Sequence, residues 1–392
     1  MATQPDWASM GVETVGQLLG DAPPAPVEPE GPLIVPVIDG YPHAFPGTGI
    51  HFGMAEEDYH AVPALSTSQI KQILASPADF WWQCRWLRAE ATEREESSYM
   101  ALGSAWHKRV LEGREAFYQR YAIDIDPRDF PEALRTVDEL KAAIIAAGGE
   151  TKGCKSKADY VARADDLGLC AWDSVIAAHA AANEGVQLIS ADDVGKIELS
   201  AAMIERHPDL KDAFVDGYPE VSIFWECERT GVPMKARLDY LKLMAIVDLK
   251  TFSNPLGKQV DRAIVGEMAG RRYYVQAPVY CEAVKAAKAA IRKHGMSAVH
   301  GDVDPQFLED WIDPATPDPT FLFVFQKSAG APVTRGMVLD GVSNVFTIGQ
   351  GQALAGKQAF ARHCRFYGSD PWIDFEPIAA FEDEAFPAWL GE

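Results

Sequence analysis

The sequence predicts an α/β protein (α+β type) in which a central mixed sheet is flanked by helices. Three consecutive segments, residues 220–225, 233–240 and 243–250, follow the period of two that is typical of strands. Residues 272–294 and 351–366 instead space their apolar side chains with the helical period. A fourth run, residues 321–326, is apolar almost throughout, which indicates another buried strand.

The chain has 392 residues and 47% hydrophobic content, enough for one large core or two modest ones. We expect residues 1–45, which are rich in Pro, Ala, Glu and Gly, to form a flexible acidic tail. Folded structure should begin near Gly49. Residues 46–392 are then expected to form a single domain with a helical insertion at about residues 130–208.

Two helix starts are predicted before the strands. Ser66 precedes apolar residues at helical spacing, among them Ile70 and Ile73, as an N-cap residue does. Ser76 is followed by Pro77, and proline is favoured in the first turn of a helix. Short helices are expected over residues 132–208, the last of them at 191–206.

The net charge of −21 is concentrated at the two ends of the chain. Residues 1–60 contain nine acids and no Lys or Arg, and residues 301–392 contain 14 acids and five basic residues. The middle of the chain therefore holds 31 of the 36 basic residues. Strong non-specific binding to the outside of a duplex is not expected, but a local basic channel or end-binding pocket is compatible with this distribution.

Several protein classes are disfavoured. No apolar stretch approaches the roughly 20 residues of a membrane span, and no signal peptide is evident, so we expect a soluble cytoplasmic protein without a membrane partner. The six cysteines form no Cys-x-x-Cys pair, which argues against an iron–sulfur cluster. Residues 351–358 nearly match a phosphate-binding P-loop, but Gln358 replaces the required Ser or Thr. We therefore expect a helix there and no bound nucleotide.

The most informative short motif is Asp248-Leu249-Lys250 at the end of the third predicted strand. Side chains alternate along a strand, so Asp248 and Lys250 project to the same side. A turn near residues 241–242 would bring Asp239, at the end of the preceding strand, toward Asp248. Two acids and a lysine can hold a divalent metal and offset the negative charge of a phosphate. The ordinary alternative to a metal site is that the acid and the lysine form a solvated ion pair at the end of the strand.

Six segments, in order, carry a resemblance to a known family. They are Leu65 to Ser68 with Ser76-Pro77, Leu102 to His107, Glu220 to Trp225, Lys235 to Asp239, Val247 to Thr251, and Tyr274 to Tyr280. In this the chain resembles RecE-type exonucleases (exonuclease VIII) and phage-encoded relatives in the PD-(D/E)xK nuclease superfamily. The resemblance covers about residues 50–330, and it implies a PD-(D/E)xK core. Leu238 departs from it, because the superfamily name places a proline before the first acid.

The resemblance assigns roles to residues that would be unremarkable alone. It implies that His107 is a metal ligand, with Asp239, Asp248 and the backbone carbonyl of Leu249, for one or two Mg²⁺ or Mn²⁺ ions. Lys250 would position the attacking water.

It also makes Glu220 a further acidic contributor. Gln276 and Tyr280 share a helix face and are expected beside the metal, in contact with DNA or with water. Arg271 and Arg272 either hold phosphate through forked hydrogen bonds or form a solvated helix start.

By resemblance, the substrate is the 5′-ended strand of linear duplex DNA, degraded processively to leave a 3′ single strand for recombination. The relatives assemble as rings, which implies a homo-tetramer, and a single-strand annealing protein is the expected partner. A bacterial or phage origin follows in the same way. Three alternatives remain: an endonuclease of the same superfamily, a relative of the nuclease modules of CRISPR adaptation or recombinational helicases, and a catalytically silent DNA-end-binding or inhibitory protein.

Overall fold

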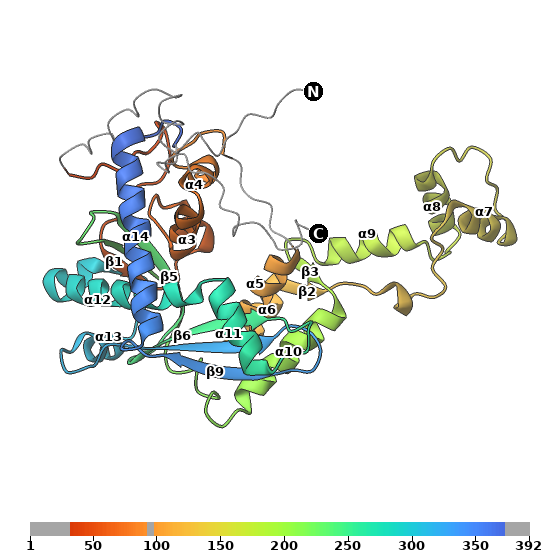
Figure 1. Cartoon of the computed structure of the whole chain (residues 1–392). Helices are drawn as coiled ribbons and strands as arrows, with labels where there is room; N and C mark the ends of the chain where they lie inside the picture. The colour runs from red at the N-terminus through yellow and green to blue at the C-terminus, as the bar shows by residue number, and fades with distance from the viewer. Residues whose placement is uncertain (1–31, 92–97, 373–392) are drawn as a thin grey trace, which may run out of the picture.

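A seven-stranded mixed sheet forms the centre of the protein, as predicted (Figure 1). The computed structural model describes residues 32–91 and 98–372. The strand order is β7-β1-β4-β5-β6-β8-β9. The strands are β1 (Gly49–His51), β4 (Tyr218–Glu226), β5 (Pro233–Leu241), β6 (Ala245–Phe252), β7 (Val299–His300), β8 (Thr320–Lys327) and β9 (Thr334–Leu339).

The four strands predicted from periodicity are all present, as β4, β5, β6 and β8. β4, β5 and β6 form an antiparallel meander, and the turn between β5 and β6 is closed by the Lys242 amide, which donates to the Ala245 carbonyl at 2.9 Å. β6 and β8 are parallel, so the chain between them crosses over the sheet. The short strands β1 and β7 and the edge strand β9 were not predicted.

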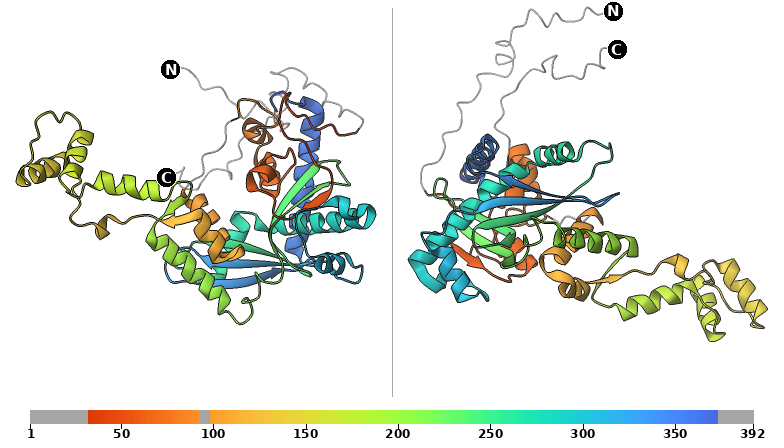
Figure 2. Two further views of the ribbon diagram at one scale, coloured as in Figure 1. Left: turned by 180° about the vertical axis from the view of Figure 1, so that it is seen from behind. Right: turned by 90° about the horizontal axis from the view of Figure 1, so that it is seen from below.

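Helices cover both faces of the sheet (Figure 2). Among the described helices, none is long and apolar enough to cross a bilayer. The helices are α2 (Glu56–Ala61), α3 (Thr67–Ala75), α4 (Pro77–Gln83), α5 (Ser98–Leu111), α6 (Gly113–Arg120), α7 (Val137–Ala146), α8 (Lys157–Asp166), α9 (Trp172–Ala182), α10 (Ala191–Glu205), α11 (Val260–Gly270), α12 (Gln276–His294), α13 (Pro305–Ile312) and α14 (Asn344–Tyr367).

Alternation along β6 divides the core between the two faces. Ile246 packs in the larger cluster with α3, α12 and α14, whereas Val247 and Leu249 pack in a second cluster with Trp106 of α5. Asp248 therefore points to the same face as Ile246, toward α12. The motif thus lies where helices from both faces approach one strand.

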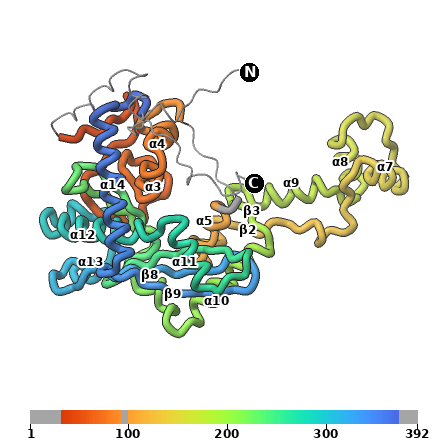
Figure 3. Tube along the Cα trace, in the orientation of Figure 1, coloured from red at the N-terminus to blue at the C-terminus, as the bar shows by residue number. Residues whose placement is uncertain are grey.

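α14 lies along α3 and α4 although they are far apart in the sequence (Figure 3). The close approach depends on Gly356, where a Cβ atom would lie 2.7 Å from Cγ2 of Ile70 on α3. Both predicted helix starts are confirmed. Ser66 forms a capping box with Gln69 at the start of α3, and Ser76 caps α4 with Pro77 in its first turn. The near P-loop segment is helical, as predicted.

Two boundaries differ from the predictions. Arg272 has a left-handed backbone (φ 52°) and a 3₁₀ turn, Tyr273–Val275, follows it, so α12 begins only at Gln276. Residues 1–31 of the expected tail lie outside the described residues. Residues 32–45 contact the core: Leu33 and Val35 pack against it, and the Tyr41 hydroxyl donates to the Ala61 carbonyl at 2.9 Å. The tail boundary at residue 45 was therefore placed too late.

Helices α7, α8 and α9 form an arm that extends away from the sheet (Figures 1 and 2). A short parallel ladder between β2 (Tyr121–Ile123) and β3 (Gln187–Ile189) closes its base. The arm has a small core of its own around Leu140, Ile144 and Ala164, so its packing is independent of the sheet. These helices lie within the predicted insertion at residues 130–208.

Candidate active site

The candidate site lies where β5 and β6 separate. Their ladder covers only Tyr240 with Val247 and Leu241 with Ile246. Beyond it, Oδ2 of Asp239 accepts a hydrogen bond from the Leu249 amide at 2.8 Å. The carboxylate thus satisfies a backbone donor that would otherwise pair with the neighbouring strand. The separation of the strands opens a space between them that side chains from both faces can enter.

Asp248 and Lys250 enter this space side by side, as their spacing predicts. The Asp248 side chain is fully buried, and its Oδ1 accepts a hydrogen bond from Nε2 of Gln276 at 2.5 Å. Nζ of Lys250 forms an ion pair with Oδ2 of Asp248. The same ammonium lies 4.0 Å from Oδ2 of Asp239 and donates to the Leu249 carbonyl at 3.3 Å. Three oxygen atoms therefore surround one positive charge.

His107 reaches the same point from α5 on the other face of the sheet. Its Nε2 lies 3.0 Å from the Leu249 carbonyl oxygen and 3.2 Å from Oδ2 of Asp239. Its Nδ1 lies 2.9 Å from the Gly103 carbonyl oxygen. Both ring nitrogens thus face acceptors, which favours the imidazolium form. Burial lowers the pKa of His107, but the Asp239 carboxylate outweighs it and the pKa rises to about 9.

The two aspartates have opposite electrostatic environments. Burial, followed by repulsion from Asp239, raises the pKa of Asp248 to about 7. Burial also acts to raise the pKa of Asp239, but Lys250 and His107 together lower it below its usual range. Burial acts to lower the pKa of Lys250, but the charges of the two aspartates outweigh burial and raise the pKa above its usual value. The raised pKa favours the charged form of Lys250 at neutral pH, which suits a hydrogen-bond donor better than a general base.

Glu220 lies across from Asp239 on β4. In the ladder between β4 and β5, the residues before and after Glu220 pair with the residues after and before Asp239, so the two acids face each other. Glu220 has a left-handed backbone (φ 53°), a conformation that costs energy in a non-glycine residue. Its carboxylate accepts from Nε of Arg237 at 2.5 Å. Burial and then the charge of Asp239 raise the pKa of Glu220. Glu220 therefore holds a proton more readily than an ordinary glutamate.

A pocket of about 400 Å³ opens beside these acids. The start of α3 forms one wall, with Thr67 and Lys71 among its lining side chains. Thr67 is 6% exposed, and its Oγ1 has no hydrogen-bond partner among the described residues. Burial and then the charge of Lys250 lower the pKa of Lys71 to about 8. The pocket thus offers a buried hydroxyl and a cation close to two carboxylates. The lining residues are Tyr59, His60, Ser66, Thr67, Ser68, Gln69, Lys71, Glu220, Lys235, Arg237, Asp239, Gln276 and Tyr280.

The predicted DNA-contacting residues divide into two groups. Gln276 and Tyr280 line the pocket from one face of α12, although Gln276 is already bonded to Asp248. Burial raises the pKa of Tyr280 well above its usual value, so its hydroxyl stays protonated. Arg271 and Arg272 do not line the pocket. Arg271, just after the end of α11, pairs with Glu267 of that helix, and its backbone carbonyl accepts a hydrogen bond from Lys71 at 3.2 Å.

Comparison with known families gives one decisive match. Residues 66–302 match the family described as "PDDEXK-like domain of unknown function (DUF3799)". The chain belongs to this family. The match spans more than half of the PDDEXK-like chain and includes β4, β5 and β6 with the acids described above. The finer assignment to RecE-type exonucleases is not established by this match.

Among solved structures, the PDDEXK-like chain is similar to a crystal structure of a "putative exonuclease" from Eubacterium rectale. The TM-score is 0.42 and the identity 14%, over 83% of this chain and 96% of that one. No curated protein matches the chain. The fold assignment therefore depends on the family match and on the sheet itself.

The predicted metal ligands partly converge in the PDDEXK-like domain. Within residues 32–91 and 98–372, no three side chains of His, Cys, Asp and Glu gather closely enough to form a metal site by themselves. The reason is local: the Lys250 ammonium separates the Asp248 carboxylate from Asp239 and His107. However, the oxygen donors that surround this ammonium are carboxylate and carbonyl groups, which magnesium and manganese prefer. The donor set therefore fits a hard divalent cation that takes the place of the ammonium.

Several residues of the PDDEXK-like site were not singled out from the sequence. Lys235 and Arg237 precede Asp239 at intervals of two, so strand periodicity places all three on one face. Lys235 is buried, and its Nζ donates to the carbonyls of Tyr59 and Val62 at 3.1 and 2.8 Å, which fixes the segment before α3. Lys71 has no local signal, because only the tertiary structure brings α3 to the end of β5.

Proposed function

We propose that this protein is a metal-dependent nuclease that hydrolyses phosphodiester bonds of DNA. The observation that carries the proposal is the convergence of Asp239, Asp248 and Lys250 at the point where β5 and β6 separate. Membership of the PDDEXK-like family supports it. A phosphate bound in the adjacent pocket would lie next to Asp239, whose carboxylate is 4.0 Å from the Lys250 ammonium.

Asp239, Asp248, the Leu249 carbonyl and His107 would hold the cation, Mg²⁺ or Mn²⁺. To do so, His107 must release its Nε2 proton and Lys250 must withdraw its ammonium from the oxygen donors. In this proposal the withdrawn ammonium neutralises a phosphate oxygen. When bound, the cation supplies positive charge that stabilises the anion developing at phosphorus and favours ionisation of the attacking water.

In the proposed hydrolysis, a water oxygen bonds to phosphorus and the bond from phosphorus to the leaving oxygen breaks. The proton of the water needs an acceptor. Glu220 lines the pocket and has a raised pKa, so it is the best candidate for a general base among the lining residues. Its carboxylate is held by Arg237 and must rotate or share this contact to accept the proton.

The finer function is also a proposal. The ordered resemblance of six segments to RecE-type exonucleases supports 5′-to-3′ degradation of linear duplex DNA, which leaves 3′ single strands for recombination. In this proposal the protein acts as a homo-oligomeric ring together with a single-strand annealing protein.

The test uses linear duplexes labelled at the 5′ or the 3′ end and a covalently closed circle, each with Mg²⁺, with Mn²⁺ or with EDTA. Progressive release of 5′ label from linear DNA, with the circle intact, is the expected result. Cleavage of the circle would identify an endonuclease instead. Binding of DNA ends without cleavage, in Mg²⁺ and in Mn²⁺, would support the alternative that the protein is a catalytically silent end-binding protein. Asp248→Asn is the inactive control.

A further inference from the structure

A buried hydrogen bond between two side chains joins α5 to β8 close to the candidate metal site. Nε1 of Trp106 donates to Oε1 of Gln326 at 2.6 Å, and both side chains are buried. Trp106 directly precedes His107, the residue through which α5 reaches the Leu249 carbonyl. The hydrogen bond therefore holds α5 at a position one residue away from a proposed ligand of the cation.

The carboxamide of Gln326 has one defined orientation. Its Nε2 donates to the Ser200 carbonyl of α10 at 2.6 Å, while its Oε1 accepts from the Trp106 indole. If the amide were turned over, a donor would face the indole N–H and an oxygen would face the carbonyl. Gln326 therefore holds Trp106 from a fixed point on the sheet, and the same side chain ties α10 to this point.

A polar residue at this position is not required for a stable core. Gln326 is fully buried, and its neighbours on this face of the sheet, Leu249 and Val324, belong to the same apolar cluster as Trp106. Replacement of both partners of a buried hydrogen bond by apolar groups of the same shape can be nearly neutral for stability. A directional hydrogen bond, by contrast, favours a single arrangement of the packed elements. The contribution of Gln326 is therefore the placement of α5.

The placement of Trp106 determines where His107 points. Successive residues of an α-helix are about 100° apart around its axis, so the direction of one side chain sets that of the next. Nδ1 of His107 lies 2.9 Å from the Gly103 carbonyl oxygen of the same helix, which fixes the ring relative to α5. That contact moves with the helix and cannot fix α5 relative to the sheet. The hydrogen bond from Trp106 to Gln326 supplies this second restraint.

The candidate site tolerates little rotation of α5. Nε2 of His107 lies 3.0 Å from the Leu249 carbonyl oxygen and 3.2 Å from Oδ2 of Asp239. Functional groups have to be held within about 0.5 Å and about 10–20° of their productive geometry. A small rotation of α5 would therefore separate His107 from the oxygen donors without unfolding the protein.

We propose that Gln326 is a positioning residue for the candidate metal site, which acts through the Trp106 indole and holds α5 in the rotation that presents Nε2 of His107 to the cation. In this scheme Gln326 and Trp106 touch neither the cation nor the DNA. The inference rests on the proposed function, because it takes His107 as a ligand of Mg²⁺ or Mn²⁺.

The test is Mn²⁺ binding by the full chain without DNA. Calorimetry gives the affinity, and pulsed electron paramagnetic resonance detects the nitrogen of an imidazole bound to the manganese. Trp106→Phe removes the N–H donor, and Gln326→Leu removes the acceptor. Replacement of residues that support metal ligands typically lowers metal affinity by about 10–100-fold. We expect each variant to bind Mn²⁺ at least about tenfold more weakly and to lose the nitrogen coupling.

The double variant Trp106→Phe/Gln326→Leu separates positioning from stability. Each single variant leaves a buried polar group without its partner, so its Tm should fall. The double variant removes both groups, so its Tm should recover most of this loss, whereas its Mn²⁺ affinity should stay as low as in the single variants. If the Mn²⁺ affinity recovered together with Tm, the hydrogen bond would only stabilise the fold and the proposal would be wrong.

Gln326→Glu is the conservative variant. A glutamate keeps an oxygen acceptor for the Trp106 indole, and in its protonated form it also donates to the Ser200 carbonyl. The nitrogen coupling should therefore be retained, although burial of an acid lowers Tm. A loss of the coupling as complete as in Gln326→Leu would contradict the role assigned to the indole contact.

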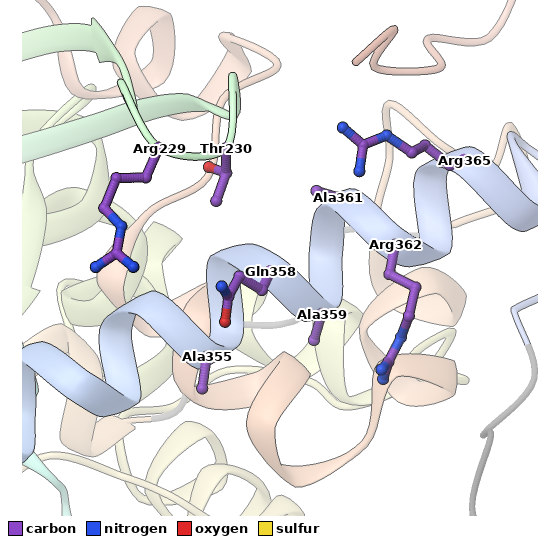
Figure 4. A pocket seen from close by; sticks show the side chains of 8 residues that line it. All are labelled: Arg229, Thr230, Ala355, Gln358, Ala359, Ala361, Arg362 and Arg365. Atoms are coloured by element: carbon purple, nitrogen blue, oxygen red, sulfur yellow. The ribbon is translucent and has the colours of Figure 1, made fainter. Parts of the chain in front are cut away.

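Two control variants make the same chemical changes outside α5. Trp225→Phe removes another buried indole donor, whose Nε1 donates to Oε1 of Glu282 at 3.0 Å. Gln358→Leu removes a carboxamide from a pocket between α14 and the turn after β4 (Figure 4). None of the described residues that line this pocket belongs to α5 or to the candidate site. Both controls should bind Mn²⁺ with the parental affinity and keep the nitrogen coupling.

The same measurements separate this inference from the proposed function. If the parent shows Mn²⁺ binding with nitrogen coupling and Trp106→Phe and Gln326→Leu behave like the parent, only this inference is wrong. If the parent binds Mn²⁺ without nitrogen coupling, His107 is not a ligand and this inference fails, while the carboxylates still hold the cation. If the parent binds no Mn²⁺, the proposed metal-dependent function fails as well.

Discussion

Replacement of Asp248 by asparagine should stabilise the metal-free protein and abolish cleavage. Asp248 is fully buried, and burial together with Asp239 raises its pKa to about 7. In the unfolded chain an aspartate titrates near 3.9. The folded state therefore binds the proton more tightly, so the stabilising contribution is complete below about pH 4 and is lost as the pH rises through 7.

The size of the effect follows from the pKa difference. The pKa of Asp248 is roughly three pH units higher in the folded than in the unfolded chain, and each unit corresponds to about 1.4 kcal/mol. At pH 8 the charged form of Asp248 therefore destabilises the folded state by about 4 kcal/mol. Asparagine keeps the shape but not the charge, so we expect the free energy of unfolding to rise by about 2–4 kcal/mol. For 392 residues this corresponds to an increase in Tm of about 2–5 °C.

The assay is thermal unfolding at pH 8 and pH 5, with EDTA or with Mg²⁺. The gain in Tm should be present at pH 8 and small at pH 5, where the parental Asp248 is protonated. Mg²⁺ should stabilise the parent, by about 2.7 kcal/mol at a hundred times its Kd, and should leave the variant unchanged. Asp166→Asn, at an exposed position on α8, is the control for the loss of one charge. A lower Tm for Asp248→Asn in EDTA, or cleavage at the parental rate in saturating Mg²⁺, would refute the reasoning.

Four other outcomes are expected. Lys250→Met should lose cleavage yet retain divalent-cation binding by calorimetry, because the lysine contacts the oxygen donors without being one of them; lost cation binding would contradict this. Thr67→Val should weaken DNA binding about fivefold without lowering Tm, since its hydroxyl has no hydrogen-bond partner within residues 32–91 and 98–372. A lower Tm with unchanged DNA binding would show instead that the Thr67 hydroxyl stabilises the fold. Deletion of residues 1–31 should leave Tm nearly unchanged, whereas deletion of 1–45 should lower it by several degrees through loss of packed apolar side chains; equal Tm values would contradict the contacts of residues 32–45. Burial and His300 lower the pKa of His51 to about 4, so stability should fall as the pH drops from about 6.5 through 4, and His51→Phe should flatten that dependence in pH-resolved melting curves.

Much of the fold could be predicted because its signals are local. The polar and apolar alternation of β4, β5 and β6, the serine caps of α3 and α4, and the helical period of α14 each reside in a few neighbouring residues. The strand ends also placed Asp239, Asp248 and Lys250 in one region, because a short turn between antiparallel strands leaves little freedom of register. No such local signal predicted the contacts of residues 32–45, because apolar residues in this proline-rich segment follow neither the helical nor the strand period.

The sequence by itself therefore determined the fold class, the four main strands and the proximity of Asp239, Asp248 and Lys250 in the candidate site. Only the tertiary structure decided how these groups are arranged. It separates β5 from β6 so that Asp239 accepts the Leu249 amide, brings His107 from the opposite face, and places Thr67 and Lys71 of α3 beside the carboxylates. The physical reason is that periodicity and capping depend on adjacent residues, whereas pKa values and pockets depend on side chains that long-range packing brings together.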